Sequence, residues 1–277
     1  MKKLIPCLLL LCAWSAQAQS FEGTIKWTMK MEITDPAMKA KMEEGMKKMN
    51  DPAMQARMKE MQAKMNDPQM KAAMEANPQM KAQMENAMKM MAGGDMNSMM
   101  PKGFSIELKN GNGLTKMEGG VMGNMEMLYL KDKDMTYHLD RQNKTYSVMD
   151  TNKDGQATPS TSAKVTKTSE TTKILGYTCT KYLVEYTEGT TTMKQSIWTT
   201  TDIKDIDLKS MSKHKIGRGQ SLYFEGLDGV PLRTEMGTPQ GSMSMEATEI
   251  KRGSVSSSDF VIPSDFKETQ GMFGKYL

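Results

Sequence analysis

The chain of 277 residues has little of the chemistry that enzymes and disulfide-bonded domains use. It contains three cysteines and two histidines, and aromatic residues make up 6% of it. Three cysteines are too few to hold together a disulfide-rich scaffold. The formal net charge is +4 with both signs mixed along the sequence, whereas nucleic-acid-binding domains concentrate positive charge. We therefore expect neither a disulfide framework nor a nucleic-acid partner.

Catalytic motifs are absent from the sequence as well. His138 lies in an expected strand and His214 in a basic loop, and neither belongs to an H-E-x-x-H pattern or a nucleophile elbow. Asp150 to Gly155 match the first half of an EF-hand loop, but the last ligand position is Thr161, which cannot supply the bidentate carboxylate. We expect a protein without enzymatic activity and without a cofactor.

Residues 1–18 have the features of a secretory signal peptide. Two lysines precede the apolar stretch Leu4–Trp14, which is too short to span a bilayer, and Ala16–Ala18 is a small-x-small cleavage site. We expect cleavage after Ala18 and a periplasmic or secreted mature chain. Cys179 would be its single cysteine, so no intramolecular disulfide could form. No later segment is apolar enough for a transmembrane helix.

Methionine is the residue that the chain has in excess. There are 33 methionines, and 18 of them lie within residues 35–100. That segment contains no Leu, Ile, Val, Phe, Tyr or Trp, and helix formers fill most of its other positions. In the mature chain Leu, Ile, Val and Phe together make up only about a seventh of the residues. Tyr, Thr and Met must therefore fill more of the core than usual.

A helix-start signal recurs in the methionine-rich segment. Asp or Asn caps free backbone N–H groups, and a following proline fits the first helical position. The signal occurs at Asp35, Asp51, Asp67 and Asn77. It predicts helices over 36–49, 52–65, 68–76 and 78–92, the last ended by Gly93-Gly94. A single helix kinked at each proline is the alternative.

Methionines three or four residues apart gather on one face of these helices. The expected hydrophobic face consists of Met38, Met42, Met46, Met49, Met54, Met58, Met61, Met65, Met70, Met74, Met80, Met84 and Met88. Such a face can pack on a neighbouring apolar surface, since methionine is flexible and polarizable. It can equally bind a lipid, another hydrophobic ligand or a protein partner. Reversible oxidation of exposed methionine is a further use.

Thioethers also suit Cu(I), which makes copper handling the alternative function. The best cluster surrounds the flexible Gly93-Gly94 and consists of Met91, Met96, Met99 and Met100. A second cluster consists of Met122, Met125 and Met127. The scarcity of histidine leaves any such site dependent on methionine alone.

The rest of the chain has a more ordinary β composition, rich in threonine and containing nearly all the branched and aromatic residues. Asn110–Gly113 is a hairpin signal, residues 150–164 a polar loop, and residues 202–211 a short helix across a sheet edge. Strands are expected at 21–33, 104–108, 114–118, 125–130, 135–139, 145–149, 177–186, 193–200, 221–225, 231–236 and 243–251. The fold class is α+β: an antiparallel β-sheet with a Met-rich helical insertion (35–100) after the first strand. Residues 19–34 and 101–277 would form the sheet domain.

Several short stretches resemble a family of secreted bacterial proteins, the domain of unknown function 4412. They are Phe21–Gly23, Thr136–Tyr146, Leu175–Tyr182, Ile197-Trp198, Gly229–Leu232 and Phe260–Pro263. The resemblance implies a sheet curved around a helix or cavity, as in the LolA-type periplasmic carriers, which hold acyl chains inside a half-barrel. It implies no catalytic residue. We therefore expect a non-enzymatic binding protein whose curved sheet and methionine helices form a hydrophobic ligand or partner site.

Overall fold

The computed structural model describes residues 20–49, 51–65, 67, 101–120, 125–149, 163–188, 191–211, 215–217, 220–221, 224–238 and 241–269. The expected signal segment, the third and fourth expected helices and the EF-hand-like loop lie outside these residues. Among the described residues, twelve strands form one sheet in the order β14-β6-β5-β4-β3-β2-β1-β13-β12-β9-β8-β7. The sheet is therefore open, with β14 and β7 at its two edges.

Two meanders make up the sheet. The first comprises β1 (Gly23–Ile33), β2 (Gly103–Lys109), β3 (Asn112–Glu118), β4 (Glu126–Leu130), β5 (Met135–Asp140) and β6 (Thr145–Met149). The second comprises β7 (Lys164–Ile174), β8 (Tyr177–Glu188), β9 (Thr191–Thr200), β12 (Val230–Thr238) and β13 (Gly241–Arg252). These pairings are antiparallel, and β1 joins the meanders because it pairs with both β2 and β13. Only the two-residue β14 (Lys267–Glu268) is parallel to its neighbour, β6.

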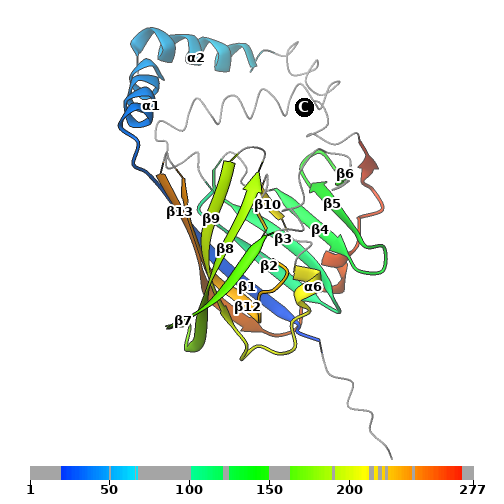
Figure 1. Ribbon diagram of the computed structural model, residues 1–277. Coiled ribbons are helices and arrows are strands. Elements are labelled where there is room, and N and C mark those ends of the chain that lie inside the picture. The colour runs from blue at the N-terminus through cyan, green and yellow to red at the C-terminus, as the bar shows by residue number, and fades with distance from the viewer. Residues whose placement is uncertain are drawn as a thin grey trace, which may run out of the picture.

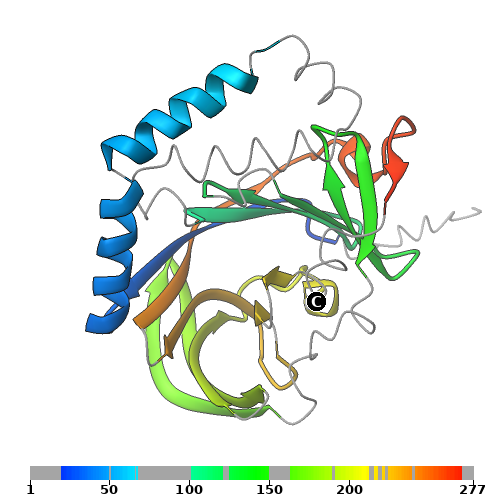
Figure 2. The same cartoon turned by 90° about the horizontal axis from the view of Figure 1, so that it is seen from above.

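The sheet curves around the segment that connects β9 to β12 (Figure 2). This segment contains the four-residue helix α6 (Leu208–Met211) and a separate small ladder of β10 (Lys215–Gly217) with β11 (Gln220–Ser221). Ile203, Ile206 and Met211 are buried in the same cluster as Trp27 and Phe104. The predicted edge helix over 202–211 is therefore wrong in length and in place, because these apolar side chains pack on the concave face of the sheet.

The centre of the concave face is aromatic and aliphatic. Trp27 and Phe104 stack with ring centroids 4.8 Å apart and an interplanar angle of 10°. Ile25 and Ile106 form the next pair on the same face, two residues away on each strand, and both are fully buried. Methionine, threonine and tyrosine supply much of the remaining core, as the scarcity of branched residues predicts: Met117, Met127, Met211, Met236, Met243, Met245, Thr115, Thr199, Thr200, Thr234, Tyr129, Tyr137, Tyr182 and Tyr186 are buried.

Two strand assignments from the sequence are wrong. The sequence predicts no strand over β7, because this edge strand is rich in threonine and lysine and is largely exposed. The sequence predicts a strand at 221–225. Among the described residues of this range, only Ser221 lies in a strand, as the last residue of β11. Phe224 instead packs against Tyr186, with ring centroids 5.5 Å apart. Polar edge strands and buried loop aromatics both break the alternation on which strand prediction depends.

The first two expected helices are present with the expected bounds. They are α1 (Pro36–Met49) and α2 (Pro52–Met65), which leave the end of β1 and turn sharply relative to each other (Figure 1). The Asp35 carboxylate accepts a hydrogen bond from Met38 N at 2.6 Å, and the Asp51 carboxylate accepts one from Ala53 N at 2.7 Å. The predicted caps at Asp35 and Asp51 are thus confirmed. At Pro52 the chain forms two separate helices, and not the single kinked helix that was the alternative.

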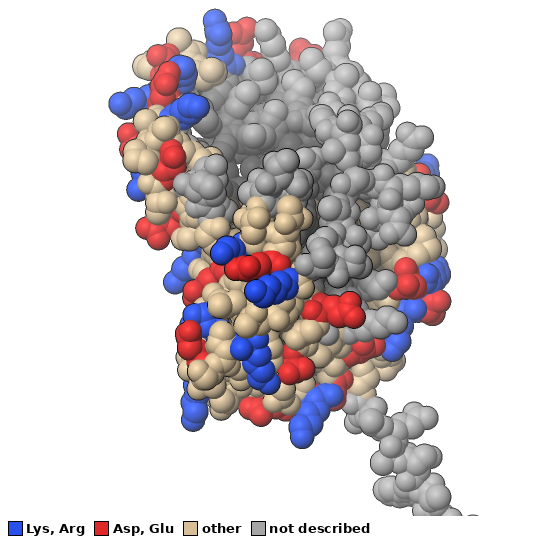
Figure 3. Space-filling model, in the orientation of Figure 1, with Lys and Arg blue, Asp and Glu red and all other residues tan. Residues whose placement is uncertain are grey.

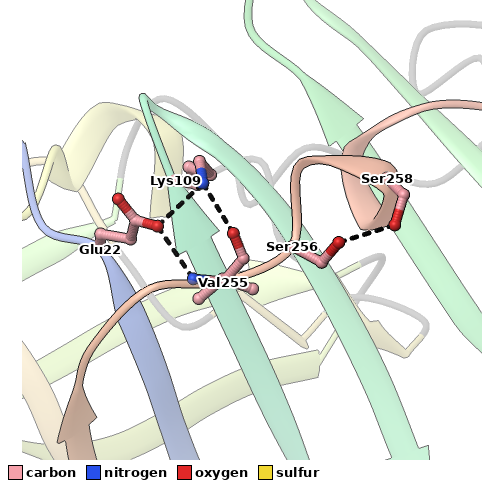
Figure 4. Close-up of polar contacts among 5 residues, drawn as sticks. All are labelled: Glu22, Lys109, Val255, Ser256 and Ser258. Atoms are coloured by element: carbon pink, nitrogen blue, oxygen red, sulfur yellow. Dashed lines mark hydrogen bonds and ion pairs between the residues drawn. The ribbon is translucent and has the colours of Figure 1, made fainter.

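Hydrogen bonds connect the segment that follows β13 to Glu22, which precedes β1, and to Lys109 of β2 (Figure 4). The Glu22 carboxylate accepts hydrogen bonds from Lys109 Nζ at 2.9 Å and from Val255 N at 2.8 Å, and Lys109 Nζ also donates to the Val255 carbonyl at 2.6 Å. These donors lower the pKa of Glu22, the Lys109 ammonium being the largest cause. Beyond this contact Phe260 covers the convex face over Leu114, Leu128 and other residues of the first meander.

The register of β1 and β2 predicts that residues 35–100 can be removed. The two strands are antiparallel neighbours, and Met29 N donates to the Lys102 carbonyl at 2.8 Å, so both ends of the segment emerge at one end of the sheet. A Gly/Ser linker of about eight residues should span them. We expect the shortened chain to keep its strand circular dichroism and a cooperative urea transition. The control is the full chain carrying Phe104→Ala, whose free energy of unfolding should fall by about 3–5 kcal/mol because the sheet core itself is disrupted. A shortened chain that does not fold would mean that the helices belong to the core.

Candidate functional site

Methionines from five strands, far apart in the sequence, meet at one end of the concave face. This end is the one at which β1 leads into α1 (Figure 1). Met29 pairs with Met245, and Met31 pairs with Met243, across the β1–β13 ladder. Directly paired residues of an antiparallel ladder point to the same face of the sheet. The members, which we call the methionine rim, are Met29, Met31, Met117, Met193, Met236, Met243 and Met245.

Exposure increases along the rim toward the helices. Met245 is 3% exposed, Met243 6% and Met236 7%, whereas Met31, close to the start of α1, is 47% exposed. The rim therefore continues the buried core outward as an apolar surface. Of the 33 methionines, 18 lie in residues 35–100, and the sheet contributes others. Sheet methionines that look scattered along the sequence form a second methionine surface.

The expected helical face falls partly within the described residues. Met38, Met42, Met46 and Met49 lie on α1, and Met54, Met58, Met61 and Met65 lie on α2. Met38 is 41% exposed and Met54 37% exposed, so these two side chains are open to solvent. Met70, Met74, Met80, Met84 and Met88 lie outside the described residues.

The residues expected to bind copper lie mostly outside the described part of the chain. This is the case for Met91, Met96, Met99 and Met100 and, in the second cluster, for Met122. Met127 is buried, and Met125 is half-buried and packs against the central core cluster. Within the described segments, no three His, Cys, Asp or Glu side chains come together as a metal site needs.

The concave face carries few charges. His138 pairs with Met127 on this face and is 8% exposed. Burial lowers its pKa, against a smaller opposite effect of Asp140 and Glu126, so the imidazole is neutral at neutral pH. Charged pairs occur on the other face of β1 and β13, where Lys26 Nζ lies 2.8 Å from the Glu249 carboxylate. In the view of Figure 3 the two signs are interspersed over the described surface.

A separate pocket of about 620 Å³ opens beside the β2–β3 and β4–β5 turns. Leu130, Phe260, Val261 and Ile262 contribute apolar side chains to its lining, and Lys131 and Lys133 contribute cationic ones. Both ammonium groups already have partners: Lys131 Nζ lies 3.0 Å from Asp207, and Lys133 Nζ lies 5.8 Å from the Tyr137 ring centroid. The rim is the stronger candidate site, because it is continuous with the central core cluster and its lining is apolar.

A family model described as "Domain of unknown function (DUF4412)" matches residues 88–266, which is more than half of the chain. The chain belongs to this family. The match begins after β1, although β1 is the central strand of the sheet. No curated protein matches the chain. Within the described segments, no helix has the length and apolar character needed to cross a lipid bilayer.

Two solved structures are similar to this chain. One is PNGF-II, with 19% identity and a TM-score of 0.38 over 63% of this chain, which spans 28% of the length of that protein. The other is LprF from Mycobacterium bovis, with 12% identity and a TM-score of 0.27 over 62% of this chain and 85% of that one. Neither similarity is close enough to transfer a ligand or an activity.

Cys179, on β8, is a buried thiol. It is fully buried, and burial is the main cause that raises its pKa to about 11. We expect iodoacetamide at mildly alkaline pH to leave the native mature chain (residues 19–277) unmodified at Cys179, because alkylation requires an accessible thiolate. Intact mass measurement before and after the addition of urea checks this, and the unfolded chain serves as the positive control. Stoichiometric alkylation of the native chain would contradict the prediction.

Proposed function

We propose that the protein is a non-enzymatic binding protein that takes a hydrophobic ligand on the methionine rim. The observation that carries the proposal is the convergence of sheet methionines at the end of the concave face where β1 leads into α1. Met31, at its outer margin, keeps 47% of its surface exposed, so apolar area is available there for a ligand. Removing such area from water is the main driving force of apolar binding.

Methionine suits a site whose ligand varies in shape. Its unbranched side chain has three rotatable bonds and a polarizable sulfur, so the same set of residues can adapt to different apolar surfaces. The helices α1 and α2 leave the sheet at the same end and carry the exposed Met38 and Met54. In this proposal they form the second side of the site, and the pair of surfaces holds a lipid or another long apolar molecule.

The proposal includes an extracytoplasmic location. It is supported by the sequence of residues 1–18, with its basic start, short apolar core and small-x-small cleavage site. A half-barrel that carries acyl chains through the periplasm, as LolA-type carriers do, is the finer form of this proposal. A protein partner for the exposed helical methionines is compatible with it, since a carrier must deliver its ligand.

A charge placed on the rim should weaken binding. We expect Met31→Lys to reduce the affinity for a fluorescent apolar dye by about tenfold or more, because a cation on an apolar contact surface must be desolvated. Met31 is half exposed, so the fold should tolerate the change. Thr28→Lys is the matched control, since it places the same side chain on the opposite face of β1. Equal affinity of the two variants, or a wild type that binds neither dye nor lipid in native mass spectrometry, would refute the proposal.

Cu(I) handling is the second candidate function, and the register of the rim favours it. Met31, Met243 and Met236 lie directly opposite one another on three adjacent strands. Opposite Cβ atoms in such pairs are about 5 Å apart, so flexible thioethers can converge on one soft ion. This would be a neutral sulfur site independent of Met91, Met96, Met99 and Met100.

A Cu(I) titration against a competing chelator tests this second candidate. If the rim binds copper, Met31→Leu combined with Met236→Leu should abolish tight binding, whereas removal of residues 35–100 should preserve it. Leucine keeps the apolar volume and removes only the sulfur, so hydrophobic ligand binding should persist in the same variant. Wild-type affinity weaker than micromolar would eliminate the copper function.

A further inference from the structure

One buried polar group interrupts the apolar row that crosses the rim. Across the sheet, Met31 pairs with Met243, Met243 with Met236, and Met236 with Gln195 of β9. The next residue in the row is Val184 of β8. Gln195 is only 7% exposed, and its Nε2 has no hydrogen-bond partner among the described residues.

An unpaired carboxamide donor in such a place is costly. A buried donor that lacks a partner costs about 1–3 kcal/mol, and native structures contain few of them. Nothing in the sheet ladder requires a glutamine here, since the residues opposite it and next to it on this face are Met236, Val184, Met193 and Ile197. An apolar residue would pack at the same position without this cost.

We propose that Gln195 Nε2 binds the polar end of the ligand, and that this end is a neutral hydrogen-bond acceptor such as an ester or amide carbonyl. The inference rests on the proposed function of the methionine rim and specifies its ligand class: an acylated molecule whose chain lies along the methionines.

The charges around Gln195 decide between a neutral acceptor and a carboxylate. Its register partners and its neighbours on the same face carry no charge. Lys194 and Glu185, adjacent to this row, pair with each other at 3.0 Å on the opposite face of the sheet. A buried carboxylate would therefore find no cation among the described neighbours of Gln195 on this face of the sheet, and its desolvation would cost far more than one amide hydrogen bond returns. A carbonyl oxygen needs only one donor.

Competition binding with three probes of equal chain length tests the proposal. Methyl laurate, laurate and dodecane compete with a fluorescent apolar dye for the full-length mature protein. We expect the ester to bind about fivefold more tightly than the alkane, which is the size of one net neutral hydrogen bond. Laurate should bind more weakly than the ester at neutral pH.

Two variants locate the effect. Gln195→Met keeps an unbranched side chain of similar length but removes the donor, so the ester should lose its advantage while dodecane binds as before. Its melting temperature without ligand should rise, because the unpaired group is gone, whereas loss of a structural glutamine would lower it. Lys194→Met is the matched control: it adds the same residue to the opposite face and should retain the preference for the ester.

The outcomes separate the two proposals. If dodecane and the ester bind the wild type equally, the role of Gln195 is wrong and the apolar site stands. If laurate binds most tightly, the head group is anionic and the neutral-acceptor inference is overturned. If none of the probes displaces the dye, the hydrophobic site itself is refuted.

Discussion

The pairing of β1 on both of its edges is the constraint on which the structure depends. Without it, the meander from β2 to β6 and the meander from β7 to β13 would be two separate sheets, each with an exposed edge. Trp27, between Phe104 of β2 and Ala247 of β13, anchors this junction by stacking on Phe104. In the middle of the sheet, β1 and β2 are antiparallel neighbours. The 35–100 segment, which connects them, therefore begins and ends at the same end of the sheet.

That placement brings two kinds of methionine together. Helix α1 leaves the sheet close to Met31 of β1, which is exposed beside the buried Met243 of β13 and Met236 of β12. A row of leucines could fill the same volume, but branched side chains offer fewer shapes to a ligand. In the proposed site, the thioethers of the rim would adapt to the chain of a ligand and the Gln195 carboxamide would select its polar end.

Local signals in the sequence were sufficient for several elements. The Asp35 and Asp51 caps act within three residues, so the bounds of α1 and α2 follow from the sequence. The turn at Asn110-Gly111, with both residues at positive φ, fixes the β2–β3 hairpin equally locally. By contrast β7 was missed, because an edge strand of threonine and lysine has no apolar side to detect.

The sequence by itself determined the methionine excess, the two capped helices, the antiparallel-sheet class and the absence of familiar catalytic motifs, and the family resemblance added the curvature of the sheet. The tertiary structure decided which methionines form a surface. Met31, Met236 and Gln195 are far apart along the chain, and only the registers of β1, β13, β12 and β9 place them in one row. Register between distant strands depends on the packing of the whole concave face, so no local pattern could have predicted this row.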